Sequence, residues 1–576
     1  MKEYARFVDL FFDHNLSGFF GLRDETAEPL SARAVRNEWS ALVRELRREG
    51  RAELFDLYVG VPFCGRLCRF CNLSPERLGA RSRVEEYLCW LDEAIGFFRP
   101  AFAKVRFGNL LLGGGTPSVL SAAQLDRLFR GLFGAFRFDP AGEKSFEFHP
   151  SSFSERKLEV LREHGFNRVI LGVQSLTPGV LRRAGRTDQT AGQVERAVRA
   201  VARAGFPRGQ NVDLILGLEG ETPASFLRSF ERAADLGPEE ISVYLLKPFG
   251  PHMARYGRSV GLFYEQADLR RSFAAVPERM IRAAERRGYR VNESPLLDLR
   301  YAFMKRSLPV EKRYYSDTPL GGSSLFALGS MARSHVCGRM SYACGPVRGA
   351  FDPEARIYDA RKVDLDNEMF RWLSHHLLSE WGLSLARFRE VFGRSFESRF
   401  AAPLRRLRRD GLLRRAQGRL LCAKDSLKDR LATRLCFVGL PALRAMLDAH
   451  NSPENQVRLV AGAAEYGVWV ERSRPEQRYV SSAGSYGLQV ARLRPGPFSP
   501  WEMKLVRWLG DLFQSLQAGA GEACGAERTY ALHEAVARHL SGAAPGRLTL
   551  KPWIRVSDRS GLGYSRAGVQ DGGMRL

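Results

Sequence analysis

The stretch Leu57-Tyr58-Val59-Gly60-Val61-Pro62-Phe63-Cys64-Gly65-Arg66-Leu67-Cys68-Arg69-Phe70-Cys71 places three cysteines, spaced C-x3-C-x2-C, directly after a strand-like apolar run. Three thiolates on one short loop can bind three irons of a 4Fe–4S cluster, which leaves the fourth iron without a protein ligand. Such an iron is free to chelate a small molecule. We therefore expect Cys64, Cys68 and Cys71 to bind a cluster, and the chemistry to start at its open iron.

Zinc and disulfide bonds explain these cysteines less well. A zinc site normally takes a fourth Cys or His at similarly short spacing, and the next histidine downstream, His149, is far away in another strand-like segment. Nine cysteines in 576 residues are dilute for a disulfide framework, and no charged-then-apolar export segment precedes them. The start at Met1 reads as a mature cytosolic N-terminus, so we expect a cytoplasmic protein.

The other six cysteines are scattered along the chain. Cys89, Cys422 and Cys436 lie in apolar contexts and are expected to be small buried residues. Cys337 and Cys344 share a glycine-containing loop, so one of the two is kept as a candidate to face the active site.

Length and composition are those of a soluble globular chain, with 44% hydrophobic and 26% charged residues among 576. This length accommodates a main catalytic domain and one to three smaller units. No apolar run of about 18 residues predicts a membrane span. The net charge of +24 favours an anionic substrate or partner, but arginine is spread through the whole chain, which indicates a compositional bias, and nucleic acid is not the expected partner.

Strand-like apolar runs alternate with segments of helical spacing such as Ala122 to Phe133 and Val194 to Ala204. The runs are Phe55 to Val61, Asn109 to Leu112, Ser145 to His149, Arg168 to Val173, Val212 to Leu216 and Glu240 to Leu246. Alternation of this kind predicts an α/β fold with a parallel sheet covered by helices on its outer face. Six units indicate a partial (β/α)6 barrel.

Chemistry in such barrels collects at the carboxyl ends of the strands, where loops converge. The three cysteines follow the first predicted strand, and the run Gly113-Gly114-Gly115-Thr116-Pro117 follows the second. Polar residues at or near the ends of the next three strands are Glu147, Gln174 and Asp213. The sequence thus predicts a site along one edge of the sheet.

In this order the motifs resemble the radical S-adenosylmethionine (SAM) enzymes, and within them the group typified by oxygen-independent coproporphyrinogen III oxidase and its haem-chaperone relatives. The resemblance covers roughly residues 50–250. It rests on Tyr58 to Cys71, Gly113 to Ser118, Phe146 to Pro150, Gly165 to Ser175, Arg186 and Asn211 to Leu218.

The resemblance implies a cluster on Cys64, Cys68 and Cys71 and one or two molecules of SAM, with reductive cleavage of the sulfonium. Tyr58 matches a tyrosine near the sulfonium and is the candidate catalytic residue. Phe70 would lie against the adenine. The remaining candidate SAM contacts are Gly114, Gly115, Thr116, Glu147, Gln174, Arg186 and Asp213, of which Arg186 suits the SAM carboxylate as a bidentate donor.

Three positions depart from the family pattern. Gly60 stands where relatives carry a histidine, Asn72-Leu73 replaces a Gly-Cys pair, and Gly217-Leu218-Glu219 replaces a Gly-Leu-Pro turn. These changes leave the SAM-binding residues in place but alter their surroundings. We therefore expect a specialised enzyme rather than the housekeeping decarboxylase of haem synthesis.

The resemblance weakens beyond residue 290, where Leu325 to Ser334 is similar to a strand and loop that close the substrate cavity in relatives. The basic run Leu404 to Leu413 carries leucines at the spacing of an amphipathic packing helix, which favours packing over DNA contact. The predicted units are an N-terminal helical segment (1–50), the barrel (51–290), a barrel-closing substrate segment (291–365), a winged-helix-like unit (366–425), an unassigned domain (426–557) with a helix at Pro500 to Gln517, and a disordered tail (558–576).

The leading hypothesis is a radical SAM oxidoreductase or C-methyltransferase that acts on a planar, anionic, tetrapyrrole-like small molecule by methylation, decarboxylation or related radical chemistry. Its electron donor would be a flavodoxin or ferredoxin. The alternative is a haem-binding chaperone of the same family, for which His335 and Cys337 are the candidate axial ligands. A nucleic-acid-modifying enzyme ranks third.

Overall fold

The computed structural model describes most of the first 440 residues and parts of the remainder. The described residues are 28–50, 55–71, 75–246, 275–293, 300–308, 324–363, 365–377, 382–423, 427–441, 457–461, 464–473, 478–483, 486–492, 499–517 and 549–552, with a few single positions besides. The predicted tail at 558–576 and part of the predicted 291–365 segment lie outside them. No helix among the described residues has the length and apolarity that crossing a membrane requires.

All six predicted strands form, and they pair with one another in parallel. This confirms the α/β fold with a parallel sheet at its centre. Their order in the sheet is their order in the chain. The strands are β2 (Phe55–Val61), β5 (Arg106–Gly114), β7 (Lys144–Phe148), β8 (Arg168–Gln174), β9 (Gln210–Leu216) and β10 (Glu240–Leu245).

Further strands extend this sheet on both sides. Next to β2 lies β13 (Ser324–Leu328), which is also parallel, followed by antiparallel neighbours. These are β14 (Arg333–Val336), β15 (Met340–Cys344), β16 (Tyr358–Lys362) and β1 (Glu28–Leu30) on one side, and β12 (Arg300–Lys305) and β11 (Tyr289–Glu293) on the other. The short strand β6 (Arg137–Phe138) pairs with β5, and β3 (Phe63–Cys64) pairs with β4 (Glu76–Arg77).

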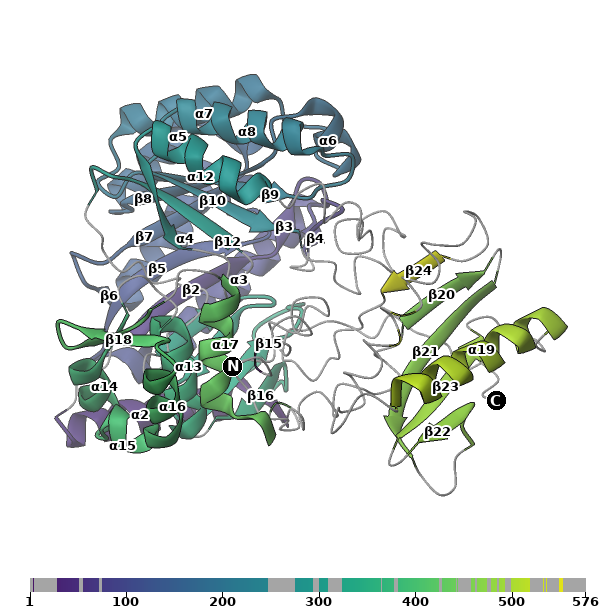
Figure 1. Cartoon of the computed structure of the whole chain (residues 1–576). Helices are drawn as coiled ribbons and strands as arrows, with labels where there is room; N and C mark the ends of the chain where they lie inside the picture. The colour runs from purple at the N-terminus through teal and green to yellow at the C-terminus, as the bar shows by residue number, and fades with distance from the viewer. Residues whose placement is uncertain are drawn as a thin grey trace.

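Helices follow the central strands and cover the outer face of the sheet (Figure 1). They are α2 (Ala32–Arg48), α3 (Arg81–Phe98), α4 (Ala122–Ala135), α5 (Glu155–Glu163), α6 (Pro178–Arg183), α7 (Ala191–Ala204), α8 (Pro223–Asp235) and α12 (Val276–Arg286), with 3-10 turns η2 (Arg99–Phe102), η3 (Pro117–Val119) and η4 (Pro150–Ser152). Capping boxes set several starts, as at Ser121 with Gln124 and Thr190 with Gln193.

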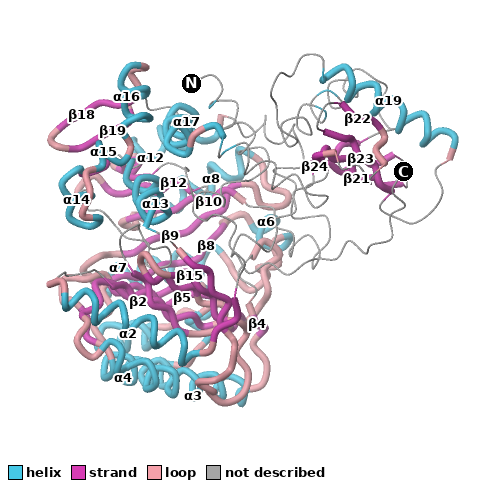
Figure 2. The backbone as a smooth tube through the Cα atoms, turned by 90° about the horizontal axis from the view of Figure 1, so that it is seen from below, coloured by secondary structure: helices cyan, strands magenta, loops and turns pink. Residues whose placement is uncertain are grey.

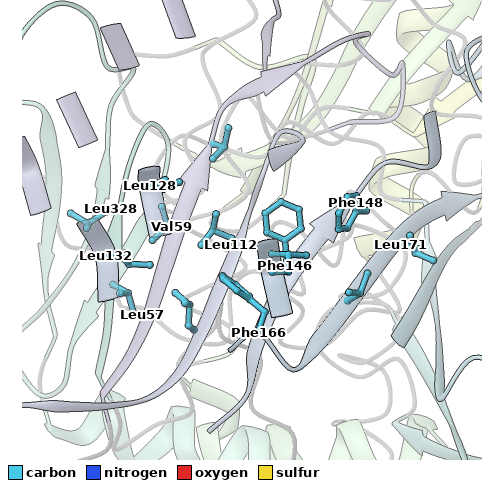
Figure 3. Close-up of a cluster of buried hydrophobic side chains, with 14 of the residues drawn as sticks. Leu57, Val59, Leu112, Leu128, Leu132, Phe146, Phe148, Phe166, Leu171 and Leu328 are labelled. Carbon is cyan, nitrogen blue, oxygen red and sulfur yellow. The ribbon is translucent and has the colours of Figure 1, made fainter. Parts of the chain in front are cut away.

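The two faces of the sheet differ because side chains alternate along each strand. Leu57 and Val59 of β2 are buried under the helices with Leu112, Phe146 and Leu171 of neighbouring strands, as Figure 3 shows. The intervening residues of these strands point to the inner face and include most of the predicted polar site residues. This alternation positions the site on the face opposite the apolar core.

A smaller unit with its own core follows the main sheet. It contains α13 (Leu365–Leu377), β17 (Leu383–Ser384), α14 (Leu385–Phe392), α15 (Phe396–Arg399), α16 (Ala401–Arg409), β18 (Leu413–Ala416), β19 (Arg419–Cys422) and α17 (Leu427–Val438). Leu404, Leu407 and Leu412 are buried, which confirms the packing role predicted for them. Helix α17, which the predicted boundary at residue 425 assigned to the next domain, packs in this core.

A five-stranded sheet and one long helix form a third core. The strands are β22 (Ser481–Ala483), β23 (Tyr486–Arg492), β21 (Ala464–Arg472), β20 (Val457–Ala461) and β24 (Thr549–Pro552). Helix α19 (Pro500–Gln517) has the predicted bounds and buries Leu505, Leu509 and Phe513 against this sheet. The remaining domain boundaries stay predictions.

Candidate active site

The three-cysteine loop leaves the end of β2 and is held by backbone hydrogen bonds on two sides. The amide of Leu78 donates to the carbonyl of Cys64 at 2.8 Å, and the amide of Arg69 donates to the carbonyl of Ala184 at 2.9 Å. Cys64 is buried, whereas Cys68 and Cys71 are half-buried. The loop is thus fixed by its backbone, while two of its thiols stay partly open.

Polar donors lie against two of the three thiols. The Thr116 hydroxyl is 3.2 Å from Cys64 Sγ, and Arg186 Nη1 donates to Cys68 Sγ at 3.6 Å. Burial raises the pKa of the Cys64 thiol to about 11, and the hydrogen bond from Thr116 acts in the opposite direction. Cluster ligation requires thiolates. A buried thiol with a hydroxyl aimed at it and a second thiol facing a guanidinium suit negatively charged sulfur, so these residues fit a 4Fe–4S cluster.

The arrangement differs from that of a site for a single ion. Among the described residues, no three His, Cys, Asp or Glu side chains converge on one point that could hold a metal ion. A 4Fe–4S cluster does not need such convergence, because its three protein thiolates bind three different irons.

The glycine run at the end of β5 is packed against the residues that lead into the cysteine loop. The Gly115 amide donates to the carbonyl of Val61 at 2.7 Å, and a Cβ on Gly115 would lie 2.6 Å from the carbonyl oxygen of Pro62. Gly114 has φ +109°, a conformation that other residues rarely adopt. The contact between loop and strand therefore has no room for side chains at these positions.

This run also gathers two predicted side chains from neighbouring strands. A Cβ on Gly113 would lie 2.9 Å from the Glu147 carboxyl group, and a Cβ on Gly114 would lie 3.3 Å from the Tyr58 hydroxyl. Tyr58, Glu147 and the glycines consequently meet at the carboxyl ends of β2, β5 and β7.

Arg186 is buried, with 4% of its surface exposed, and is not one of the many surface arginines. Its guanidinium donates to the Gly172 carbonyl at 2.5 Å and to Gln189 Oε1 at 2.7 Å, in addition to Cys68. Gln189 in turn donates to the Val173 carbonyl at 2.7 Å. The sequence analysis missed Gln189, although its position three residues after Arg186 places it within reach of the guanidinium.

Asp213, Gln174 and Phe70 lie further along the same edge of the sheet. Asp213 is half-buried on β9 and accepts a hydrogen bond from Asn211 at 2.6 Å. Gln174 has φ +67° at an irregularity between β8 and β9. Phe70 packs on a small apolar cluster, which consists of Val180, Ala184, Ile215, Leu218 and Leu246. Their predicted contacts with SAM, like those of the other candidates, stay predictions.

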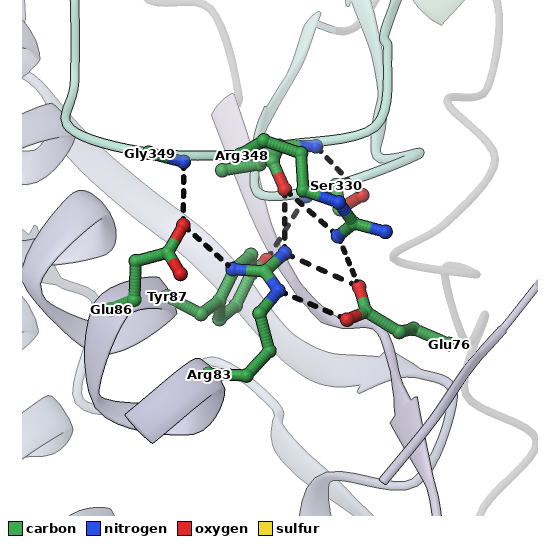
Figure 4. Close-up of polar contacts among 8 residues, drawn as sticks. Glu76, Arg83, Glu86, Tyr87, Ser330, Arg348 and Gly349 are labelled. Carbon is green, nitrogen blue, oxygen red and sulfur yellow. Dashed lines mark hydrogen bonds and ion pairs between the residues drawn. The ribbon is translucent and has the colours of Figure 1, made fainter. Parts of the chain in front are cut away.

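A polar network anchors the residues that precede and follow the loop (Figure 4). The Tyr87 hydroxyl donates to the Gly60 carbonyl at 2.5 Å and accepts from the Ser330 amide at 3.0 Å. Glu76 of β4 pairs with Arg83 at 2.9 Å and also with Arg348. The network ties the cysteine loop to α3 and to the segments after β13 and β15.

His149, at the end of β7, was considered in the sequence only as a distant zinc ligand. Its Nδ1 accepts hydrogen bonds from the Ser151 amide at 3.1 Å and the Ser151 hydroxyl at 2.7 Å. Burial, and to a smaller extent the charge of Arg186, lower the pKa of His149 to about 3. A neutral imidazole therefore lies near Arg186 of the candidate site, within the stretch Phe146 to Pro150 that carries the family resemblance.

The remaining cysteines agree only in part with the sequence. Cys436 is buried and Cys422 partly buried, but the prediction that Cys89 is buried is wrong, since it is exposed on α3 with its sulfur 3.4 Å from Arg127. Cys344 is buried in β15 and Cys337 is partly exposed.

His335, the other half of the candidate haem-ligand pair, has both ring nitrogens engaged. Its Nε2 is 2.5 Å from Glu368, and its Nδ1 is 2.6 Å from the Ser341 hydroxyl. These contacts do not favour His335 as an axial ligand.

Comparison with known proteins shows which families the sequence around this site resembles. The model of the radical SAM superfamily matches residues 58–233, which include the cysteine loop, the glycine run and Arg186. The chain belongs to the radical SAM superfamily. A second model, the HemN C-terminal domain, matches residues 363–424.

Relatives of this radical SAM protein include both enzymes and chaperones. It is 36% identical over 188 residues to the oxygen-independent coproporphyrinogen III oxidase of Escherichia coli (strain K12), an alignment that covers 33% of this chain and 41% of that protein. It is 26% identical over 364 residues to the heme chaperone HemW of Lactococcus lactis, covering 62% and 90%. The alignment with the oxidase thus spans less than half of the oxidase's length.

A solved structure shows the same fold. The structure of coproporphyrinogen III oxidase (HemN) from Escherichia coli aligns with a TM-score of 0.54 and 24% sequence identity, covering 67% of this chain and 90% of that one. The chain therefore shares its fold with that structure over the aligned region. The family implies a 4Fe–4S cluster and SAM as cofactors.

Proposed function

We propose that the chain is a HemN-type radical SAM enzyme that modifies a tetrapyrrole or a similar planar anionic molecule. One observation carries the proposal: Thr116 and Arg186 direct donors at two of the three thiols of a C-x3-C-x2-C loop. Donors of this kind stabilise the thiolates that cluster ligation requires. The six parallel strands are proposed to form the partial barrel of this family.

The residues of the candidate site would have different roles in binding the cluster and SAM. Cys64, Cys68 and Cys71 would hold the cluster, which when bound supplies the electron that cleaves SAM. The glycine run would offer its backbone to the methionine end of SAM. Tyr58 and Glu147, which meet over that run, would orient the ligand at the carboxyl edge of the sheet. The packing of Phe70 leaves one apolar surface for an adenine at the same edge.

The reaction type is proposed at two levels. Radical modification of a tetrapyrrole-like substrate follows from the relatives named above. Decarboxylation, methylation with a second SAM and related carbon–carbon chemistry are the finer alternatives. The oxidase named above favours an oxidative reaction over methylation. A flavodoxin or ferredoxin is the proposed donor of electrons, and the cytoplasm the proposed location.

The test begins with anaerobically purified chain reconstituted with iron and sulfide. We expect iron–sulfur absorbance and, with dithionite and SAM, formation of 5′-deoxyadenosine measured by chromatography. S-adenosylhomocysteine would appear in addition if methyl transfer occurs. The triple variant with Cys64, Cys68 and Cys71 changed to alanine should lose absorbance and product, while Cys89→Ala, an exposed cysteine outside the loop, should keep both. Wild-type chain that carries a cluster but yields no SAM product would reject the enzyme.

A haem chaperone is the second candidate, because the match to the Lactococcus lactis chaperone covers 90% of that protein. Such a protein would bind haem without turnover. Titration with haem, followed by the Soret band, should then saturate at one equivalent in chain that forms no 5′-deoxyadenosine. The same titration of Cys337→Ala tests Cys337 as an axial ligand, because the contacts of His335 make Cys337 the better candidate of the two. An unchanged band in that variant would exclude Cys337.

A further inference from the structure

The small unit after the main sheet carries a concentration of arginine that packing does not explain. Residues 382–423 contain eleven arginines, no lysine and three acidic residues, a net charge of +8 out of +24 for all 576 residues. A general bias toward arginine would replace lysine but would leave the acidic residues in place. The excess here comes mainly from added arginines and to a lesser extent from missing carboxylates.

The leucines and arginines of this unit point in opposite directions. On α16, Leu404 and Leu407 are buried in the core, whereas Arg405, Arg408 and Arg409 are exposed. The hairpin of β18 and β19 follows at once, with Arg414, Arg415 and Arg419 exposed. The packing role predicted for this helix is therefore fulfilled by its leucines, and the exposed arginines lie outside the core that they form.

A shared contact places one arginine of the helix close to one arginine of the hairpin. Oε1 of Glu397 lies 3.3 Å from Arg408 of α16 and 3.4 Å from Arg415 of β18. One carboxylate reaches both, so the two cations are close neighbours. Figure 2 shows α16 and β18 at the periphery of the molecule, and β18 also lies at the edge in Figure 1.

The order of elements matches a nucleic-acid-binding arrangement. A helix (α13), a short strand (β17), two helical segments (α14, and α15 with α16) and a hairpin (β18 and β19) follow one another, and the three strands pair in the order β17-β19-β18. This is the order of a winged helix, in which the last helix enters a groove of DNA and the hairpin lies along the backbone. The major groove of B-form DNA admits one α-helix.

We propose that α16 and the β18–β19 hairpin form a binding surface for double-stranded DNA. Arginines on both elements would contact phosphates, to which the planar guanidinium is well matched. Binding would be driven by release of counterions and would show little sequence preference. This inference is independent of the cluster and of the proposed reaction.

The full-length chain tests the proposal by fluorescence anisotropy with a labelled DNA duplex of about two helical turns, titrated at about 50 to 200 mM salt. We expect binding that weakens linearly in log–log form with salt. The variant Arg405→Gln/Arg408→Gln/Arg409→Gln should bind at least tenfold more weakly and reduce the salt slope by about three, roughly one for each phosphate that no longer faces an arginine.

The matched control removes three exposed arginines from α2 instead, as Arg44→Gln/Arg47→Gln/Arg48→Gln, with the same loss of net charge. It should keep near wild-type affinity. Equal loss in both variants would show that only the overall charge matters and would overturn the proposal. Equal or tighter binding to a single strand or to duplex RNA, or no binding to the DNA duplex at low salt, would overturn it as well. Circular dichroism of each variant shows that the fold is retained.

Discussion

At the scale of single residues, the contact between Thr116 and Cys64 indicates a role for the threonine that the family resemblance did not suggest. The sequence analysis expected Thr116 to contact SAM, whereas its hydroxyl lies 3.2 Å from the Cys64 sulfur. Hydrogen bonds to the sulfurs of an iron–sulfur cluster raise its reduction potential. Thr116 would therefore act through Cys64, as a positioning residue.

Thr116→Val keeps the shape of the side chain and removes the hydroxyl. One hydrogen bond of about 1 kcal/mol corresponds to about 40 mV for a one-electron couple, so the potential of the cluster should fall by this order. An EPR-monitored redox titration measures it. Thr116→Ser, which retains the hydroxyl, should stay near wild type. A potential that moves equally in both variants, or an unchanged potential in Thr116→Val with a full cluster, would contradict the role.

Glu221 provides a second residue-scale prediction, concerning stability and pH. Burial raises the pKa of its carboxyl group to about 8, although it accepts a hydrogen bond from the Gly217 amide at 2.8 Å. The folded chain then holds a proton that the unfolded chain releases above its ordinary pKa of 4.5. Since the folded state binds more protons, the free energy of unfolding should decrease as the pH rises from about 4.5 to about 8.

Glu221→Gln removes this titration and can still accept the hydrogen bond. The variant should match wild type near pH 5 and exceed it near pH 8 by about 3 kcal/mol. Urea unfolding at the two pH values measures the difference, and taking variant minus wild type removes the contribution of other groups, such as Asp56 with its pKa raised to about 7 by burial. A difference that is the same at both pH values would show that Glu221 does not titrate in this window.

Single residues also show where sequence reasoning stops. The cysteines were found from their spacing, and the glycine run from its position after a predicted strand. Both are local patterns that the sequence shows without the fold. The surroundings of Arg186 were not found in this way, because nothing local distinguishes it from surface arginines, and its contacts with Gly172 of β8 and Cys68 of the cysteine loop come from other segments. Cys89 was misplaced because its apolar neighbours Leu88 and Trp90 hide the helical phase, which turns its side chain outward.

At the scale of secondary structure elements, the glycine run and the cysteine loop act as one packed unit. A Cβ on Gly115 would meet the backbone of Pro62 and Phe63 at 2.6 to 2.8 Å, and backbone cannot rotate away as a side chain can. Gly115→Ala should therefore displace the loop and reduce iron content after reconstitution by at least half, with the far-ultraviolet circular dichroism unchanged.

The control for Gly115→Ala is Gly134→Ala on α4, where a Cβ would meet no atom within 4 Å. Alanine favours a helix, so this variant should be more stable by about 0.5–1 kcal/mol and should load iron as wild type does. Full iron loading in Gly115→Ala would show that the loop tolerates the shift and that the close fit is not required for cluster binding.

The central strands could be read from the sequence because parallel strands buried on one face by helices are apolar at alternate positions and end in glycine or polar turns. The edge strands β14, β15, β16 and β1 were not predicted. They are short, and their pairing joins residues 28–30 to residues 358–360, a separation that no local pattern reveals. The helix at Pro500–Gln517 was found because it is long and strongly periodic.

At the scale of the whole molecule, one buried ion pair joins the main sheet to the HemN-like C-terminal unit. His335 of β14 and Glu368 of α13 are 2% and 0% exposed, and their Nε2 and Oε1 atoms are 2.5 Å apart. The sequence suggested a haem ligand at His335 because haem takes an axial His, Cys or Met, and His335 lies two residues from Cys337. The partner of His335 comes from the next unit, and only the assembled fold brings it there.

Because the pair is buried, removing one member leaves the other without its partner in a place that water does not reach. Glu368→Ala should lower the free energy of unfolding by about 3–5 kcal/mol, whereas His335→Leu/Glu368→Leu, which removes both polar groups, should lose much less. Urea unfolding of the full chain, followed by the fluorescence of Trp372 and its neighbours, measures both. If the pair only fills space, the double variant will be the less stable of the two; if it joins the units, the single variant will be.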